Sequence, residues 1–498
     1  MSKSESPLRR LLIQASHYSL GSLLTTIAGL VSFPLLTRAF SVADYGVMNL
    51  VGATLTASVA IGKFGIQHSI IRYRSEIGAG KGNYSFAQLI STTLFGMLVT
   101  GFITMLVVMV GSHFAPIDWV AEPRVRLVMQ IVSVLIIVQV VESVFLNFLR
   151  ADQETAALMR YQVVKKYLSL GFMLFAVFVV RQSLTAFYIA SLTAESIALA
   201  WLARIAFRQG VRPRPRLADF SPPLYRELLG FGIPMMIGYE LSGIVLSVGD
   251  RYVVAEMIGQ VPLGLYGAAY NLCQYVQGIL VASVGQAIMP IYMKIWDEKG
   301  ADETATFIGK SLRTYAMFGA PIIAGLAAVG PELLPSLASE RYASASMVLP
   351  WVISGMVVEG ANNMLGAGLF IHRKTRIIMT IVMSTAIQNI VLNVLLVPRF
   401  GIVGSAAATL VSYGTTATAM AFTGRSLLRV RIPWFTLLRA AIASVLMYLA
   451  VSRLFPGHNL ITVAVRAAAG VAVYVVLMAL IDPDARHLVK RAVSRFVR

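Results

Sequence analysis

The sequence predicts an all-α protein that lies in a membrane and crosses it about fourteen times. Its 498 residues are 57% hydrophobic and 13% charged, and the mean hydropathy is +0.74. A soluble protein of this length would carry roughly 25% charged residues, so the chain has too little polar surface to cover a water-soluble particle. Long apolar segments follow one another along the chain, and basic residues gather in alternate connections between them. These observations together indicate a multi-pass helical membrane protein.

The apolar segments reach or approach the ~20 residues that a helix needs to cross the hydrocarbon of a bilayer. They lie at residues 11–36, 45–62, 86–112, 127–149, 161–180, 184–203, 228–249, 263–289, 311–334, 344–370, 377–397, 402–424, 434–453 and 460–481. The first is too long for the apolar part of a signal peptide and lacks a small-residue cleavage site, so we expect it to be retained as a helix. Two boundaries are open: the second helix could extend past Arg72, and prolines interrupt the stretch 331–350.

Basic residues predict the orientation of these helices. If both ends of the chain are cytoplasmic, Lys and Arg concentrate in every cytoplasmic connection, as the positive-inside rule requires. The opposite side then keeps nine of the 42, namely Arg38, Arg124, Arg126, Arg181, Arg251, Arg341, Arg399, Arg453 and Arg466. The formal net charge of +19 is therefore mainly a topology signal, and no nucleic-acid partner is needed to explain it.

Short motifs recur at a nearly constant distance along the chain. Tyr45-Gly46 and Asn49-Leu50 match Tyr266-Gly267 and Asn271-Leu272, Val141-Glu142 matches Val358-Glu359, and Arg181 before Leu192 matches Arg399 before Leu410. The common shift predicts two parallel repeats of six helices. We therefore expect an N-lobe at residues 1–210, a proline-rich cytoplasmic linker at 211–227, a C-lobe at 228–430, and a helix pair with a basic tail at 431–498. Two bundles related in this way commonly enclose a central cavity.

The sequence lacks the motifs of several other classes of protein. Cys273 is the only cysteine, which excludes an intrachain disulfide and a thiolate metal site, and the histidines show no metal-ligand spacing. The nearest phosphate-binding loop, at Gly309-Lys310-Ser311, has Thr304 where its first glycine should stand. We therefore expect a transporter rather than an enzyme, with no cofactor, no metal and no catalytic residues.

Four motifs resemble those of a known family. They are Leu36-Thr37-Arg38-Ala39-Phe40-Ser41 with Asp44-Tyr45-Gly46, Phe64-Gly65 with Ser69 and Arg72-Tyr73, Gly249-Asp250-Arg251-Tyr252 with Leu263-Gly264-Leu265-Tyr266, and Val397-Pro398-Arg399-Phe400-Gly401-Ile402-Val403-Gly404-Ser405-Ala406. As a set they resemble the Wzx-like polysaccharide transporter (PST) family of oligosaccharide flippases, in the multidrug/oligosaccharidyl-lipid/polysaccharide (MOP) exporter superfamily. They run from residue 36 to residue 406, so the resemblance covers most of the chain.

The resemblance implies a fold and a function. The fold would be two six-helix lobes in a V with pseudo-two-fold symmetry, plus the C-terminal helix pair, in the bacterial inner membrane. The function would be to move undecaprenyl-diphosphate-linked oligosaccharide repeat units from the cytoplasmic to the periplasmic leaflet, for exopolysaccharide or O-antigen assembly. Transport would proceed by alternating access coupled to Na⁺ or H⁺, and the polymerase and export machinery would be partners.

A lipid-linked diphosphate needs cations for its phosphates and hydrogen-bonding groups for its sugars. Basic residues near the second helix are candidates for the diphosphate: Lys63, Arg72 and Arg74. Polar residues inside other helices are candidates for the sugar: His17, Gln277, Asn362 and Asn363. For each basic residue, the alternative is a topology signal at a helix end, and for each amide an interhelical hydrogen bond.

Charged residues elsewhere are candidates for gating and ion coupling. Arg38, Asp250 and Arg251 stand in repeat-related connections, where an ion pair could close a gate or hold the structure. Glu142, Glu240 and Glu359 lie within apolar segments, where a charged side chain costs roughly 2.5–3.5 kcal/mol at the centre of a membrane helix, so we expect each to face a cavity or a partner. These three are the candidates for ion coupling.

Three alternative functions stay open. A drug or cation antiporter of the same superfamily would rely on an acidic residue in the first helix, and residues 11–36 contain none. A polysaccharide polymerase would want a large periplasmic loop, which the apolar pattern leaves no room for. A non-transporting scaffold would have little use for carboxylates at membrane depth.

Overall fold

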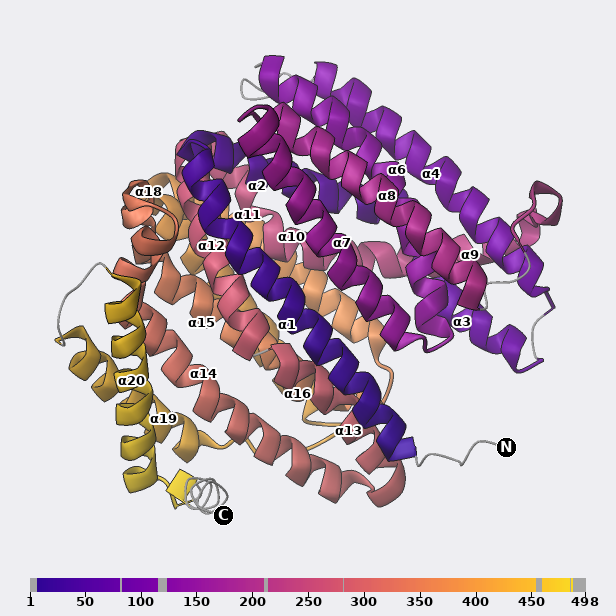
Figure 1. Ribbon diagram of the computed structural model, residues 1–498. Helices are drawn as coiled ribbons and strands as arrows, with labels where there is room; N and C mark the ends of the chain where they lie inside the picture. Colours follow the sequence, from indigo (N-terminus) through magenta and orange to yellow (C-terminus); the bar gives the residue numbers. More distant parts are fainter. Residues whose placement is uncertain are drawn as a thin grey trace. The chain divides into compact units, whose positions relative to one another are not determined.

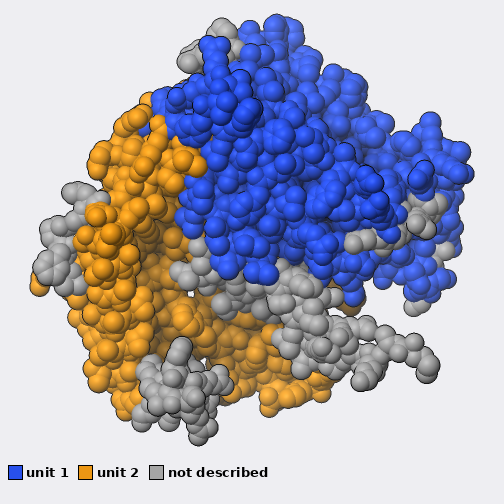
Figure 2. Space-filling view, in the orientation of Figure 1, with its two compact units in different colours: residues 1–32, 39–252 blue, residues 33–38, 253–498 orange. Residues whose placement is uncertain are grey.

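The computed structural model describes residues 7–80, 83–114, 123–209, 214–280, 282–453, 459–483 and 485–486, and all the regular secondary structure of these residues is helical (Figure 1). Side chains at 7–19, 123–124, 209, 279–280 and 282–287 lie outside the description. The predicted all-α class is confirmed. The chain packs into two units, residues 1–32 with 39–252 (unit 1) and residues 33–38 with 253–498 (unit 2) (Figure 2).

Unit 1 is a bundle of long helices with short connections. Its elements are α1 (Pro7–Ala39, of which residues 33–38 pack with unit 2), α2 (Val42–Gly62), α3 (Ile66–Gly78), α4 (Phe86–Phe114), α6 (Pro123–Ala151), α7 (Thr155–Phe175), the π-helical turn η1 (Ala176–Val180), α8 (Leu184–Gln209), the 3-10 turn η2 (Leu217–Asp219), α9 (Pro222–Met235), the π-helical segment η3 (Met236–Leu241), α10 (Ser242–Val248) and the start of α11 (Asp250–Ile258). The helices α4, α6 and α8 lie side by side (Figure 1).

The second predicted helix is interrupted, so its extension past Arg72 is wrong. Helix α2 ends at Gly62, and α3 begins at Ile66 after Phe64 and Gly65, whose φ values are 49° and 73°. These left-handed conformations cannot continue a right-handed helix. The basic residues that follow therefore lie on a separate short helix.

Unit 2 contains the remaining helices. They are the rest of α11, α12 (Gln260–Leu280), α13 (Ala282–Lys299), α14 (Ala301–Leu337), the 3-10 segment η4 (Glu340–Val348), α15 (Leu349–Gly360), α16 (Asn362–Leu365), α17 (Ala367–Ile371), α18 (Thr375–Gly424), α19 (Trp434–Ser452) and α20 (Leu460–Ile481). Inside α18, Gly401 has φ 58° and ψ −139°, three residues after Pro398, so α18 is two helices joined by a kink. This kink falls between the predicted segments 377–397 and 402–424.

The number of membrane-crossing helices agrees approximately with the prediction. Among the described residues, twelve helices are long and apolar enough to cross a membrane. The kinked α18 counts once among them, and the 21-residue α12 is not included. These two helices account for the difference from fourteen. The predicted lobes 1–210 and 228–430, the linker 211–227 and the C-terminal part 431–498 stay predictions. The two packed units divide the main part of the chain at 252/253.

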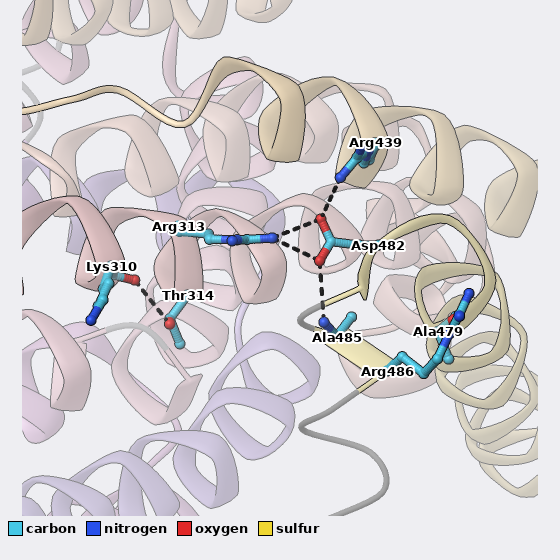
Figure 3. A network of polar contacts seen from close by, with 8 residues as sticks. All are labelled: Lys310, Arg313, Thr314, Arg439, Ala479, Asp482, Ala485 and Arg486. Atoms are coloured by element: carbon cyan, nitrogen blue, oxygen red, sulfur yellow. Dashed lines mark hydrogen bonds and ion pairs between the residues drawn. The ribbon is translucent and has the colours of Figure 1, made fainter.

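The last two helices form a hairpin that packs on α14. In Figure 1 the yellow α20 and the ochre α19 lie beside each other and along α14. One carboxylate joins all three helices: Asp482, directly after α20, accepts hydrogen bonds from Arg313 of α14 and Arg439 of α19 (Figure 3). We call these three residues the Asp482 clasp.

Candidate substrate and coupling sites

The helix that carries Glu240 changes to π-helical geometry in the middle of the membrane-spanning segment. The run α9–η3–α10 contains Pro234, which has no N–H to donate and whose ring clashes with the preceding turn. The π-helical geometry of η3 follows directly after it and includes Glu240. Ser242 donates a hydrogen bond to the carbonyl of Ile237, which satisfies one group at the break (2.9 Å). Such π-helical interruptions occur frequently at functional sites.

Three side chains from the α2–α3 break surround the Glu240 carboxylate. Gln67 donates a hydrogen bond to it, the Nε2 atom of His68 lies 3.3 Å from Oε2, and the ammonium of Lys63 lies 3.6 Å from Oε1. The side chains of Lys63, Glu240 and His68 are 19%, 20% and 28% exposed. We call these four residues the Glu240 cluster.

A close backbone contact brings this cluster together within unit 1. Gly65 lies against Gly232 of α9 so closely that a Cβ atom on Gly65 would collide with the carbonyl of Gly232. One turn later, the hydroxyl of Ser69 donates to the carbonyl of Leu228 (2.9 Å). The positive φ of Gly65 turns α3 so that its first residues face the broken helix. Helix α3 is therefore fixed against α9 directly before the π-helical segment.

The cluster contains a cation, an anion and a titratable imidazole that are all partly exposed. Lys63 and Glu240 compensate each other's charge, so neither is left unpaired among the helices of unit 1. An anionic ligand that replaced the carboxylate would meet donors from Lys63, His68 and Gln67. The groups that hold the carboxylate are thus of the kinds that bind phosphate in proteins.

Of the two arginines predicted to bind the diphosphate, Arg72 is exposed and pairs within its own helix, whereas Arg74 pairs with a residue that follows another helix. Arg72 is 53% exposed, pairs with Glu76 at 2.9 Å and lies over the ring of Phe231 at 5.1 Å. It stands four residues after His68, so both lie on the same face of α3. Arg74 is instead held by Asp152 at the end of α6 (2.9 Å) and lies over the ring of Phe86, so it joins helices of unit 1.

The predicted coupling carboxylates each have a partner. Glu142 accepts a hydrogen bond from Lys165 of α7 (2.6 Å), whereas its repeat mate Glu359 accepts one from Gln277 (3.3 Å). Gln277 also donates to the carbonyl of Met356, so this predicted sugar ligand is engaged within unit 2. Glu142 and Glu359 thus occupy matching positions in the two sequence repeats, but the partner of Glu142 is charged and that of Glu359 is neutral.

The other predicted residues are dispersed over both units. Asn362 begins α16, and its buried Oδ1 has no hydrogen-bond partner among the described residues. Asn363 is exposed and accepts from Tyr292 through its backbone carbonyl (3.4 Å). Arg38 donates to the carbonyl of Ser336 (2.8 Å) within unit 2. Asp250 and Arg251 are buried at the start of α11. The side chain of His17 lies outside the described residues.

Sequence reasoning missed three residues that the structure brings to these sites. His68 and Gln67 join the Glu240 cluster, and the four-residue spacing of His68 and Arg72 was the available signal. Lys165 was counted among the cytoplasmic basic residues, but its ammonium is bound to Glu142 and lies 3.3 Å from Glu195. A lysine ten residues into an apolar helix, opposite two apolar segments that each contain a glutamate, was the signal for this contact.

Unit 2 contains an apolar cavity of about 510 Å³ between α14, α19 and α20. Its walls include Met317, Phe318, Ile322, Val471, Val475 and Met478. Among its described lining residues one is charged, Arg466, which is paired with Glu332 and donates to the carbonyl of Val451. An apolar chain suits such a cavity better than a sugar does.

Comparisons with known proteins agree with this architecture. The family model described as "Polysaccharide biosynthesis protein" matches residues 11–296. An uncharacterized membrane protein, MJ1068, of Methanocaldococcus jannaschii is 26% identical over 200 residues, which are 39% of this chain and 38% of that protein. The chain therefore aligns with well under half the length of this relative.

Solved structures show the same fold. The lipid II flippase MurJ, in an inward closed conformation, matches with a TM-score of 0.73 and 14% identity over 94% of this chain and 99% of that one. An inward-facing multidrug resistance MATE family transporter of the MOP superfamily matches with a TM-score of 0.61 and 13% identity over 82% of this chain and 94% of that one. At these identities the likeness concerns the fold alone.

Proposed function

Because the chain belongs to the polysaccharide biosynthesis protein family of the MOP superfamily, we propose that it flips undecaprenyl-diphosphate-linked oligosaccharide repeat units across the membrane. The units would pass from the cytoplasmic to the periplasmic leaflet of a bacterial inner membrane, for exopolysaccharide or O-antigen assembly. The chain is a multi-pass membrane protein. The positive-inside count supports an orientation with both termini in the cytoplasm.

The Glu240 cluster is the observation that carries this proposal. Its ammonium and imidazole can bind a diphosphate, and its carboxylate occupies their donors when no substrate is bound. Arrival of the diphosphate would displace Glu240 from Lys63 and leave a carboxylate free to take up a proton or a cation. This exchange links substrate binding to the charge of the broken helix, which is what ion-coupled alternating access requires.

The apolar cavity of unit 2 supports a lipid-linked substrate. Its size and lining suit part of an isoprenoid or acyl chain, and the ion-paired Arg466 leaves little free charge inside it. A water-soluble sugar would gain nothing from these walls. The proposal therefore concerns a lipid carrier, and transport rather than catalysis.

The test uses cells that lack this chain. Without the flippase, lipid-linked repeat units should accumulate in the inner leaflet, where mass spectrometry of extracted lipids identifies their sugars. Reintroducing the native chain should restore polymer export. Lys63→Ala removes a charge-assisted contact worth about 1.5–3 kcal/mol, so export should fall roughly tenfold to a hundredfold. Lys294→Ala, at a surface pair with Glu298, is the matched control and should export normally.

Glu240→Gln separates binding from transport. The amide no longer competes for Lys63, so affinity for undecaprenyl diphosphate should rise while the rate of export falls. Normal export by both Lys63→Ala and His68→Ala at normal protein levels would contradict the proposal. Export of cationic drugs without any accumulation of lipid-linked sugars would favour the antiporter alternative instead.

A further inference from the structure

A second ionisable network lies in unit 1, away from the Glu240 cluster. Lys165 of α7 stands between two carboxylates, Glu142 of α6 at 2.6 Å and Glu195 of α8 at 3.3 Å. Gln139, one turn before Glu142, donates a hydrogen bond to the same oxygen of Glu195 (2.9 Å). We call Glu142, Lys165 and Glu195 the Lys165 triad. Both carboxylates are largely buried, since their side chains are 9% and 11% exposed.

The charges of this triad do not balance. Two carboxylates share one ammonium, which leaves one negative charge in excess if all three groups are ionised. The next lysine, Lys166, is exposed, acts on Glu195 only through space, and forms no ion pair within the described part of the chain. Among the side chains that the structure describes, the remaining titratable neighbour is Tyr161 of α7, which is buried close to both glutamates. An excess negative charge at this depth is costly, and binding of one proton removes it.

We propose that Glu195 binds a proton and that this step couples a proton to transport. When Glu195 is protonated, the Lys165 ammonium pairs with Glu142 alone. Glu195 is the acceptor because Lys165 lies closer to Glu142, so the more weakly held carboxylate takes the proton. A proton from water binds one carboxylate oxygen, while Gln139 can still donate to the other. Loss of the proton lets the ammonium be shared again.

The triad is placed where such a change can move a helix. Lys165 joins α7 to α6 and α8, so sharing or releasing its ammonium changes how α7 is held on either side. Two residues later, Tyr167 donates to the carbonyl of Leu24 in α1, and α7 ends in the π-helical turn η1. A shift of α7 is thereby passed to a second helix of the same unit. This role rests on the proposed function being ion-coupled.

The first experiment needs no substrate. Infrared spectra of the full chain in lipid vesicles, recorded from about pH 8 to about pH 5, should gain the C=O stretching band of a protonated carboxyl group. The band should disappear in Glu195→Gln and persist in Glu195→Asp. It should also persist in Glu298→Gln, an exposed control. If Glu195→Gln leaves the spectrum unchanged, the triad is a permanent ion pair and the proposal is wrong.

The second experiment measures export with and without a proton gradient. Export by the native chain should depend on the gradient, and Glu195→Gln should lose the part of this dependence that Glu195 carries, while any part carried by Glu240 remains. Full gradient dependence in Glu195→Gln would overturn the coupling step. If Glu195 titrates as expected but the native chain moves no lipid-linked sugar, the proton site stands and the proposed flippase function fails.

Discussion

The Asp482 clasp offers a direct test of what holds the C-terminal hairpin on α14. Asp482 is 0% exposed, and its two oxygens accept hydrogen bonds from Arg313 at 2.8 and 2.9 Å, from Arg439 at 3.2 Å and from the backbone N–H of Ala485 at 3.1 Å (Figure 3). Asp482→Asn keeps the shape of the side chain but removes its charge. The two guanidinium groups would then face each other without a counter-ion.

The magnitude follows from burial. Breaking a buried charge pair by removing one partner costs about 3–5 kcal/mol, but the two arginine side chains are 27% and 37% exposed, so solvent screens part of the loss. We therefore expect local opening of the hairpin to become easier by about 2–3 kcal/mol, or roughly 30- to 150-fold. Hydrogen exchange of the peptides covering α19 and α20 measures this opening directly.

Asp297→Asn is the control, because Asp297 is exposed near the end of α13. It should leave exchange in the hairpin within about 0.5 kcal/mol of the native value. If Asp482→Asn changes exchange in α19 and α20 no more than this control does, the clasp does not hold the hairpin, and apolar packing on α14 is sufficient.

The remaining predictions concern pH and packing. Burial raises the pKa of Asp482, but the Ala485 N–H and the two arginines outweigh burial and hold this pKa below the ordinary value. The clasp should therefore persist from about pH 8 to about pH 5 and weaken only below about pH 4. Weakening would be measured as faster hydrogen exchange in α19 and α20, after correction for the intrinsic exchange rates. Gly65→Ala should lower the stability of the protein by about 1–2 kcal/mol for the positive φ and by about 1–3 kcal/mol more for the collision with Gly232. Gly80 also has a positive φ but lies in open space, so Gly80→Ala should lose only the first of these contributions. Equal losses of thermal stability in the two variants would contradict this prediction. Asn393→Leu should lower the stability of the protein by about 0.5–2 kcal/mol, because the Oδ1 of Asn393 accepts a hydrogen bond from the buried Ser405 across the kink of α18. If the losses of Asn393→Leu and Ser405→Ala simply add in the double variant, this hydrogen bond contributes nothing to stability.

The fold could be predicted from the sequence because bilayer thickness imposes one strong rule on apolar length. The predicted segments coincide with helices to within a few residues at α4, α19 and α20. Hydropathy could not reveal where a helix is broken internally. The π-helical segment η3 is a backbone event inside the apolar stretch 228–249, whereas the left-handed residues before α3 coincide with the predicted end of the second apolar segment at residue 62.

The candidate sites were only partly predictable, because the sequence shows which residues are charged but not which residue each of them pairs with. Lys63 and Glu240 were both predicted, for different roles, and the structure places them 3.6 Å apart. Arg74 was predicted for the same role as Lys63, but Asp152 holds it between helices. Long-range pairing depends on which helices pack together, and the Gly65–Gly232 contact that decides it here occupies two small residues with no charge or periodicity.

Exposure alone does not separate the ion pairs that can change partners from those that hold the structure, because Arg74–Asp152 is as exposed as Lys63–Glu240; the distance to the partner and the presence of an alternative partner also count. Asp482 has no contact with solvent and four hydrogen bonds, so breaking its clasp would leave an uncompensated buried charge. Glu240 is one-fifth exposed and lies 3.6 Å from the Lys63 ammonium, so water can solvate the carboxylate if this pair opens, and an anion such as a phosphate could then pair with the ammonium. The Lys165 triad lies between these two cases. Its carboxylates are nearly buried, but the Lys165 ammonium is within 3.3 Å of both of them and can pair with either. If transport is ion-coupled as we propose, some charge contacts must change in each cycle, and the Glu240 cluster and the Lys165 triad are our candidates for them.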